Sequence, residues 1–385
     1  MTIGVEAPSR DRLVNRAALE AAELAPHLAG LPLSAAWKRL VALTSVSTIM
    51  RSSLFEKRGS GAIVDTVAVI EGLGRGGIAP GLIYALTSQI FGIQWPLAAV
   101  EGALSAEQRD RIIDGSILLC HALTEESGGS DPLSMTTAAT PVENGSYRLT
   151  GRKAYVTAAP IADLSLTFAR TSPGRSPFAL TAFLVPTDTR GVARSAPFDK
   201  SALPEIPMGA IDFDDVSLPA TAAVTAEGSG LALLTSTTTW ERALLMSYAV
   251  GLMQRTLETA IQWTTSRTQF GRSMGQSPLT ASRVADLAIG VHRVRTLVND
   301  IAAKIDSSAQ LRSLAAEAAM VKISCAHDLM EFETIAGRLF GARAVIADSE
   351  YAINTSTALA ASIYAGTNDL LRISIARDLG LPVEN

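Results

Sequence analysis

The stretch "GSYRLTGRKAYVT" at residues 145–157 decides the fold class, because its apolar residues alternate with polar ones. Alternation with a period of two is typical of a β-strand that buries one face. Three further stretches share this character, with Gly, Pro and Ser between them: "ADLSLTFART" (162–171), "FALTAFLVPTD" (178–188) and "MGAIDFDDVSLP" (208–219). The pattern predicts a central antiparallel β domain over residues 116–225.

Helical patterns lie on both sides of this region. Ser9–Leu28 is rich in Ala, Leu, Glu and Arg, with apolar residues three and four apart. Ser105–Gly115 begins with an N-cap serine, has Gln108 at the capping-box position and ends at a glycine. Long helical segments resume after the β region, at 249–267, 282–305 and 311–340. We therefore expect an α+β chain, with helical domains over residues 1–115 and 226–385.

The composition is that of a folded globular protein. Of the 385 residues, 48% are hydrophobic and 18% are charged, and the formal net charge is −4. A chain of this length predicts two or three structural domains. A mildly acidic chain without a dense Lys/Arg stripe gives no electrostatic reason to bind nucleic acid or an anionic membrane. Cys120 and Cys325 belong to no C-x-x-C pair, which predicts buried reduced thiols rather than a zinc site or a disulfide.

Two segments bear on cellular location. The stretch "MTIGVEAPSRDRLVNR" (1–16) is polar and lacks the apolar core of a signal peptide. Residues 76–100 carry no charge, but Pro, Gln and repeated Gly make this run poor lipid-facing material. We therefore expect buried helices broken near Gly92–Pro96 rather than a membrane span, and a cytoplasmic protein.

Several catalytic signatures are incomplete. Gly72, Gly74 and Gly77 form a G-x-G-x-x-G sequence, but a dinucleotide site needs a preceding strand and an acid about 20 residues later. The next acid is Glu101, so we favour a glycine-rich connection between helices over a nicotinamide site. The histidines show no metal-ligand spacing, and we expect no metal. No G-x-S-x-G elbow is present, although this does not exclude a Ser-His-Asp triad.

Three other stretches hold residue types suited to binding, and each also has a simpler interpretation. "HALTEESGGSDPLSMTT" (121–137) leads from an apolar strand into glycines whose N–H groups, with the Ser130 hydroxyl, suit a pyrophosphate or form an ordinary turn. "RTQFGRSMG" (267–275) pairs a cation with an aromatic ring, or is a helix C-terminus. "SIYAGTNDLLRISIARDLG" (362–380) has a Thr-Asn pair before an amphipathic helix, where either residue suits an N-cap.

Taken in order, these stretches resemble the acyl-CoA dehydrogenase family of flavoproteins. "ALTEESGGSD" is similar to the family's "TEPGAGSD", "GRKAYVTAAPIAD" to "G.K.WITN…AD", "RTQFG" to "R.QFG" and "YAGTNDLLRISIAR" to "YEGT…..R..IAR". The resemblance covers nearly the whole chain. It implies an N-terminal α-helical domain, a β-barrel-like middle domain, a C-terminal four-helix bundle and bound FAD.

The resemblance also implies which residues would hold the flavin ring. Thr124 and Thr157 would approach the isoalloxazine, and Leu123 would lie beside it. Tyr155 stands where the family often has a Trp that packs on the flavin. These residues come from two stretches of the β region, which the fold must bring together.

Other matched positions would bind the rest of the cofactor. Gly129 and Ser130 would contact its pyrophosphate side, and Thr367 would close over it. Arg267 and Phe270 would reach the FAD of a neighbouring subunit, which implies a homodimer or a homotetramer.

Some positions depart from the family pattern. Pro278 lies where the family usually has a Gln near the partner's FAD. Arg338 and Ala342 lie where a Gln and the second Gly of a Gly-Gly pair are common, and "STALAAS" (356–362) lacks the usual Arg-Asp. These changes bear on the adenosine end of the cofactor site and on the subunit contact rather than on the chemistry.

The family reaction needs a carboxylate base, and Glu241 is the candidate. Most relatives place the base immediately before the Gly-Thr of the last motif, where this chain has Ala365. Isovaleryl-type, long-chain-type and some carrier-protein-dependent relatives place it in an "ER" pair on the helix before "R.QFG", where Glu241 and Arg242 lie. These two are the only charges from Gly228 to Gln254. A structural ion pair is the alternative, although neighbours in a helix point about 100° apart.

The resemblance implies FAD-dependent oxidation of an acyl thioester to its α,β-unsaturated form. Glu241 would take the α proton while hydride passes from the β carbon to flavin N5. Whether coenzyme A or a carrier protein bears the acyl group stays open, as does the electron acceptor, for which an electron-transfer flavoprotein is one candidate. The alternatives are an oxidase or monooxygenase that uses O₂, and a flavin-less member that acts as a binding subunit.

Overall fold

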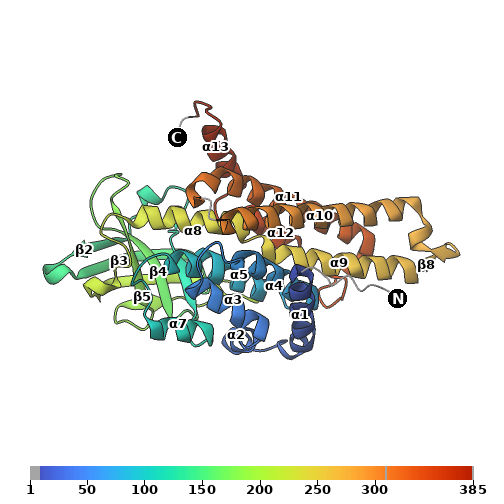
Figure 1. Ribbon diagram of the computed structural model, residues 1–385, viewed down its shortest axis with the longest axis horizontal. Coiled ribbons are helices and arrows are strands. Elements are labelled where there is room, and N and C mark those ends of the chain that lie inside the picture. Colours follow the sequence, from blue (N-terminus) through green and yellow to red (C-terminus); the bar gives the residue numbers. More distant parts are fainter. Residues whose placement is uncertain (1–8, 308–309, 384–385) are drawn as a thin grey trace.

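The computed structural model describes residues 9–307 and 310–383 and arranges them in three parts (Figure 1). Along the sequence, helical parts precede and follow a β part, as predicted for an α+β chain. The first eight residues of the polar N-terminal stretch and the last two of the predicted C-terminal domain lie outside the described residues. Among the described helices, none is both long enough and apolar enough to cross a membrane.

The N-terminal part is helical. Its elements are α1 (Ser9–Leu24), α2 (Leu33–Val41), α3 (Thr44–Phe55), α4 (Ala62–Gly76), α5 (Pro80–Thr87), a π-helical segment η2 (Ser88–Gln94), α6 (Trp95–Ala98) and α7 (Ala106–Ile113). α4 is buried along most of its length, in keeping with a sequence in which apolar residues predominate. The predicted capping box starts α7: Gln108 N donates to Ser105 Oγ at 3.1 Å, and Ser105 N donates to Gln108 Oε1 at 2.8 Å.

The central part is a sheet of seven strands among the described residues. They are β1 (Leu119–Ala122), β2 (Ala138–Pro141), β3 (Tyr147–Thr157), β4 (Leu164–Arg170), β5 (Leu180–Pro186), β6 (Val192–Arg194) and β7 (Met208–Leu218). Their order is β1-β4-β2-β3-β7-β6, with β5 beside β4. β1 and β2 run parallel to β4, so the sheet is mixed rather than wholly antiparallel. β4 and β5 are buried on both faces, which suits their nearly continuous apolar sequences.

The C-terminal part consists of long helices that lie lengthwise against one another (Figure 1). Its elements are α8 (Gly230–Leu244), α9 (Ser247–Ser266), the strands β8 (Thr268–Gln269) and β9 (Arg272–Ser273), α10 (Pro278–Asp306), α11 (Ala315–Phe340), α12 (Thr355–Ala361) and α13 (Asn368–Asp378). The apolar stretch around Glu241 is two helices, because the chain turns at Leu245 and Met246. Figure 1 shows the sheet at one end of the molecule and the β8–β9 hairpin at the other.

The G-x-G-x-x-G sequence serves helix packing. Gly72 and Gly74 lie inside α4, where a dinucleotide site would need a strand before them. A Cβ at Gly72 would lie 2.4 Å from the carbonyl of Val14 on α1, and one at Gly74 would lie 2.9 Å from Leu252 N on α9. The predicted connection between helices therefore holds only for Gly77, which ends α4 with a φ of 95°.

The uncharged run of residues 76–100 does not break near Gly92–Pro96, contrary to the sequence prediction. α5 continues directly into the π-helical η2 and then into α6, and this run is largely buried. Pro96 lies at the junction of η2 and α6 and does not interrupt the helical run. π-helical segments are frequent at functional sites, and this one packs against α8.

Candidate active site

Glu241 lies near the end of α8, and its direction is set by the residue before it. Trp240 stacks on Phe91 of η2, with ring centroids 6.1 Å apart, and on Trp95 of α6, at 5.5 Å. The stacking fixes the rotation of α8 about its axis, because consecutive side chains of a helix keep a constant angular offset. Glu241 therefore has a fixed direction toward η2.

The Glu241 carboxyl group occupies space that a glycine leaves open. A Cβ at Gly92 of η2 would lie 2.6 Å from Glu241 Oε1 and 3.2 Å from its Cδ. Real Cβ atoms do not approach an oxygen so closely, so a larger residue at this position would displace the carboxyl group. Sequence analysis did not single out Gly92 for this role.

Burial raises the pKa of Glu241 from 4.5 to about 7, although the positive charge of Arg242 opposes the shift. Arg242 does not pair with this carboxylate; its Nε donates to the carbonyl of Ala365 at 2.9 Å. Within residues 9–307 and 310–383, no salt bridge includes Glu241. A carboxyl group with a pKa near neutrality and no ion pair has the properties of a general base.

Three tyrosines from different elements meet beside Glu241. The Tyr84 ring of α5 lies 5.7 Å from the Tyr248 ring of α9 and 5.2 Å from the Tyr364 ring, measured between centroids. The hydroxyl oxygens of Tyr248 and Tyr364 are 3.2 Å apart. Burial raises the pKa of Tyr84, and the charge of Glu241 raises it further, so the phenol and the carboxyl group share one buried space.

Tyr84 also connects Glu241 to the end of β3. Its hydroxyl interacts with the side chain of Thr157, which lowers the Tyr84 pKa but does not offset burial. Tyr155 is 57% exposed with a φ of 57°, and its ring centroid lies 6.0 Å from that of Phe198. The pairing of β3 with β7 shifts register here, which explains why strict alternation fails around Tyr155.

A buried ion pair anchors the loop that follows β1. Lys153 Nζ lies 3.1 Å from Glu125 Oε1 and donates to the Leu123 carbonyl at 3.0 Å. Glu125 also accepts the N–H groups of Thr136 at 2.7 Å and Thr137 at 2.8 Å. Burial disfavours the charge on Glu125, but the hydrogen bonds from Thr136 and Thr137 and the charge of Lys153 prevail and lower its pKa to about 2.

The same loop contains four of the predicted cofactor residues. Leu123 and Thr124 are half-buried, and a Cβ at Gly129 would lie 2.5 Å from Thr124 Oγ1, so the glycine lets the loop fold back on itself. At Gly128, which has a φ of 149°, nothing lies within 4 Å of such a Cβ. Ser130 is exposed at the edge of the loop. The loop therefore presents open backbone beside Thr124.

The turn before α13 is held from two sides. Thr367 caps the helix, since its hydroxyl accepts the N–H three residues further on at 3.4 Å, in agreement with one of the two predicted N-caps. Ala365 has a left-handed φ of 54°, and its carbonyl is the acceptor for Arg242. Lys322 of α11 donates to the next carbonyl, that of Gly366, at 2.9 Å.

Arg267 and Phe270 lie at the β8–β9 hairpin, at the opposite end of the molecule from the sheet (Figure 1). The Arg267 guanidinium stacks on Trp263 of its own chain, 4.7 Å from the ring centre. Phe270 is fully exposed. Within one chain these two residues are not brought together with the loop after β1. Three departures from the family pattern belong to this part of the fold: Pro278 in the first turn of α10, exposed Arg338 near the end of α11, and Ala342 beyond it.

The histidines are not combined into a catalytic group. His121 bonds with a Thr237 hydroxyl at 3.2 Å, and burial lowers its pKa to about 4, so it is neutral at neutral pH. On α11 a group of possible metal ligands comprises His327, Asp328 and Glu331. Arg293 already lies 2.7 Å from the Asp328 carboxylate and 3.4 Å from that of Glu331. This arrangement is an ion-pair cluster on the helix surface.

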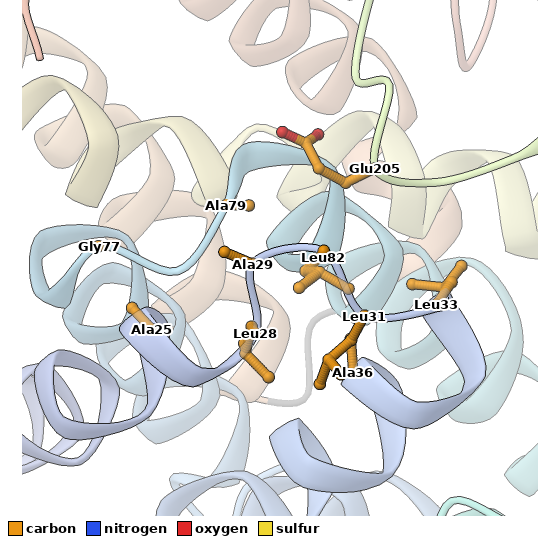
Figure 2. Close-up of a pocket in the computed structure, with 11 residues that line it drawn as sticks. Ala25, Leu28, Ala29, Leu31, Leu33, Ala36, Gly77, Ala79, Leu82 and Glu205 are labelled. Carbon is orange, nitrogen blue, oxygen red and sulfur yellow. The ribbon is translucent and has the colours of Figure 1, made fainter. Parts of the chain in front are cut away.

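A pocket of about 250 Å³ lies away from Glu241, between the α1–α2 connection and the start of α5 (Figure 2). Its wall is apolar and includes Leu28, Leu31, Leu33 and Leu82, with the carboxylate of Glu205 at the rim. Glu205 accepts the N–H of Gly81 at 3.0 Å, which ties this carboxylate to the first turn of α5. The pocket contains none of the residues predicted from sequence.

Two family models match this chain. "Acyl-CoA dehydrogenase, middle domain" matches residues 120–216, and "Acyl-CoA dehydrogenase, C-terminal domain" matches residues 228–380. An L-prolyl-[peptidyl-carrier protein] dehydrogenase from Pseudomonas fluorescens is 30% identical over 329 residues, which cover 84% of this chain and 84% of that relative. The chain belongs to the acyl-CoA dehydrogenase family. This membership confirms the resemblance noted in the sequence.

Two solved structures extend the comparison to the fold. The FAD complex of PigA superposes with a TM-score of 0.87 at 26% identity, covering 98% of this chain and 99% of that one. The prolyl acyl carrier protein oxidase AnaB superposes with a TM-score of 0.85 at 25% identity, covering 97% and 99%. Both matches span helical and β parts alike, which confirms the predicted fold class.

Proposed function

We propose that this acyl-CoA dehydrogenase family member oxidises an acyl group, bound to a carrier protein as a thioester, with FAD as cofactor and Glu241 as base. Family membership and the relatives described above support FAD-dependent dehydrogenation of an acyl thioester. The observation that carries the choice of base is the half-buried Glu241 carboxyl group, unpaired among the described residues, with a pKa of about 7. The commoner base position is Ala365, which has no group that can accept a proton.

The loop after β1 and the end of β3 fit FAD. The backbone at Gly128 is open, and the neighbouring Tyr155 and Phe198 rings are exposed at 57% and 37%, which leaves aromatic surface for a planar ring system. The residues that would hold the flavin ring are Leu123, Thr124, Tyr155 and Thr157, with Gly129 and Ser130 at the pyrophosphate and Thr367 at the turn before α13. When bound, FAD supplies the acceptor for the hydride that leaves the β carbon of the substrate.

The side chains of this chain perform the proton chemistry. The α C–H bond breaks, its proton passes to a Glu241 oxygen, and its electron pair becomes the new double bond as the β hydride leaves. Water would compete for the carboxylate and weaken it as a base, and the aromatic stack of Trp240 on η2 and α6 restricts its access. The Tyr84, Tyr248 and Tyr364 rings pack together beside Glu241, and the acyl group would lie against them.

A small cyclic acyl group is the first substrate to test. The relative from Pseudomonas fluorescens is named for a prolyl group on a peptidyl-carrier protein, and AnaB for a prolyl group on an acyl carrier protein. Because AnaB is named an oxidase, reoxidation by O₂ is the second candidate reaction for this chain. Reduced protein mixed with air separates the two, since a dehydrogenase reoxidises slowly and an oxidase rapidly.

The assembly is part of the proposal. Arg267 and Phe270 lie too far along the bundle to serve the cofactor of their own chain, which supports their predicted contact with a neighbouring subunit in a homodimer or homotetramer. An electron-transfer flavoprotein remains the proposed acceptor, and the predicted domain boundaries near residues 115 and 225 remain predictions.

Glu241→Gln tests the function directly. Both proteins are purified with FAD and titrated without oxygen, using prolyl thioesters of a carrier protein and of coenzyme A. The parent protein should lose its flavin absorbance with one of them, whereas Glu241→Gln should keep FAD and show no loss. Normal bleaching in Glu241→Gln would exclude it as base. A parent protein that no thioester bleaches would overturn the proposed reaction, and one that takes up no FAD would support the binding-subunit alternative.

A further inference from the structure

Lys322 is a buried cation that the proposed reaction does not use. It lies on α11 with no exposed surface, and its Nζ donates to the Gly366 carbonyl at 2.9 Å and to Asn368 Oδ1 at 2.8 Å. Nζ also lies 5.8 Å from the centre of the Tyr364 ring. A buried ammonium group persists only where partners replace its water. All of these partners belong to the turn of residues 364–368.

A second cation holds the same turn from the opposite side. Arg242 Nε donates to the carbonyl of Ala365, one residue before the carbonyl that Lys322 binds. The two positive charges are close enough to influence each other: burial, and then the charge of Arg242, lower the pKa of Lys322 to about 7. Two cations are thus held together by two consecutive peptide carbonyls.

The turn would not keep its shape unaided. Ala365 has a φ of 54°, in the left-handed region that residues with a Cβ adopt only when their surroundings hold them there. Gly366 follows with a φ of 94°, and a Cβ there would lie 3.3 Å from the Arg242 guanidinium. Without its anchor, Ala365 would relax toward negative φ and swing its carbonyl away from Arg242.

We propose that Lys322 is a positioning residue for Glu241: it fixes the turn of residues 364–368, which fixes Arg242, which stands next to the base. The same anchor holds Tyr364 against Tyr84 and Tyr248, on the acyl side of the site. This inference rests on the function proposed above, because it concerns the same base.

The direction of the effect follows from the charges that face Glu241. They are Arg242 on its own helix and Tyr84 on α5, and η2 carries no titratable side chain. Lys322 on α11 interacts with Arg242 and affects Glu241 through it. Loss of Lys322 releases the turn of residues 364–368 and frees Arg242 to move away. This movement weakens the stabilisation of the Glu241 carboxylate, so the pH midpoint for its action should rise above that of the parent protein.

Anaerobic flavin reduction by a prolyl thioester, measured at saturating substrate from about pH 5 to about pH 9, tests the proposal. Lys322→Met should lower the rate constant about tenfold, as expected for a displaced catalytic group, and raise its pH midpoint by about half a unit. Adding Ala365→Gly to Lys322→Met should restore most of the rate constant and return the pH midpoint most of the way to its parent value, because glycine adopts the left-handed conformation without support from Lys322. Lys304→Met removes a half-exposed lysine on α10 as the control and should change neither the rate constant nor the midpoint.

The inference would be overturned if Lys322→Met had the same rate constant and the same pH midpoint as the parent protein. A slower variant with an unmoved midpoint and no recovery by Ala365→Gly would assign Lys322 a merely structural role. If Lys322→Met does not fold, Asn368→Ala removes one of its acceptors, and an unchanged midpoint there counts against the proposal. A parent protein that no thioester bleaches defeats the proposed function instead.

Discussion

Replacement of Gly92 by alanine should displace the base while leaving the fold intact. The added Cβ would lie 2.6 Å from Glu241 Oε1, whereas ordinary contact begins at 3.4 Å, so the carboxyl group must retreat by about 0.8 Å. It sits at the free end of a flexible side chain, so the move costs little stability. A misplacement near 1 Å costs roughly 100-fold in rate, so we expect flavin reduction to slow by about 10-fold to 100-fold.

Stopped-flow reduction of bound flavin, together with thermal unfolding, measures both effects. The matched control is Gly290→Ala in α10, where the Cβ would lie 3.5 Å from Phe332 and 3.7 Å from Met253 and should fit. A shorter base provides a second check: in the Gly92→Ala background, Glu241→Asp should cost less activity than in the parent protein. Gly92→Ala with an unchanged rate constant would refute the placement of Glu241 against η2.

Three further outcomes follow from the titratable groups. The rate constant for flavin reduction should rise as the pH passes about 7, because Glu241 must lose its proton to act, and a flat profile around neutrality would contradict this. Lys153→Met should lower the free energy of unfolding by about 3–5 kcal/mol and weaken FAD retention, because it leaves Glu125 buried without its ion-pair partner. Urea unfolding and flavin titration measure these two effects. An unaltered urea midpoint would contradict a stabilising role for the Lys153–Glu125 ion pair. Burial raises the pKa of Glu333 from 4.5 to about 8, so between these pH values the folded chain keeps a proton that the unfolded chain loses. The free energy of unfolding should therefore fall as the pH rises from 4.5 to about 8, and Glu333→Gln should make this fall less steep in unfolding experiments. An equal dependence on pH in both proteins would count against the pKa shift.

Local sequence patterns predicted much of the fold. The order of helical, β and helical parts, the capping box at Ser105 and the N-cap at Thr367 all depend on residues near one another in sequence, where propensity and hydrogen bonding act directly. Glu241 could be singled out because it was the lone acid of an apolar helix. The same signal was available for Lys322, the lone cation of "AAMVKISCA", and sequence analysis passed over it.

The rest of the site depends on contacts between distant parts of the chain. Gly92 meets Glu241 across about 150 residues, and Tyr84 meets Thr157 across more than 70, so no periodicity could pair them. The sequence of the π-helical η2 is as apolar as that of a buried α-helix, so the sequence pattern could not predict its different backbone hydrogen bonding. The parallel pairing of β1 with β4 likewise depends on the path of the chain between them.

In the proposed assembly, the distance between Glu241 and the β8–β9 hairpin would place the base and the hairpin of each complete site on different copies of the chain. If the hairpin of one copy completes the cofactor site of another, a mutation of Glu241 removes the base from its own chain's site. A mutation in the hairpin instead damages the cofactor site of the neighbouring chain. Two inactive proteins, Glu241→Gln and Phe270→Ala, would then regain activity when unfolded and refolded together, because some mixed assemblies contain one site with both an intact base and an intact hairpin. Such complementation between defective chains would be a property of the assembly that neither chain possesses alone.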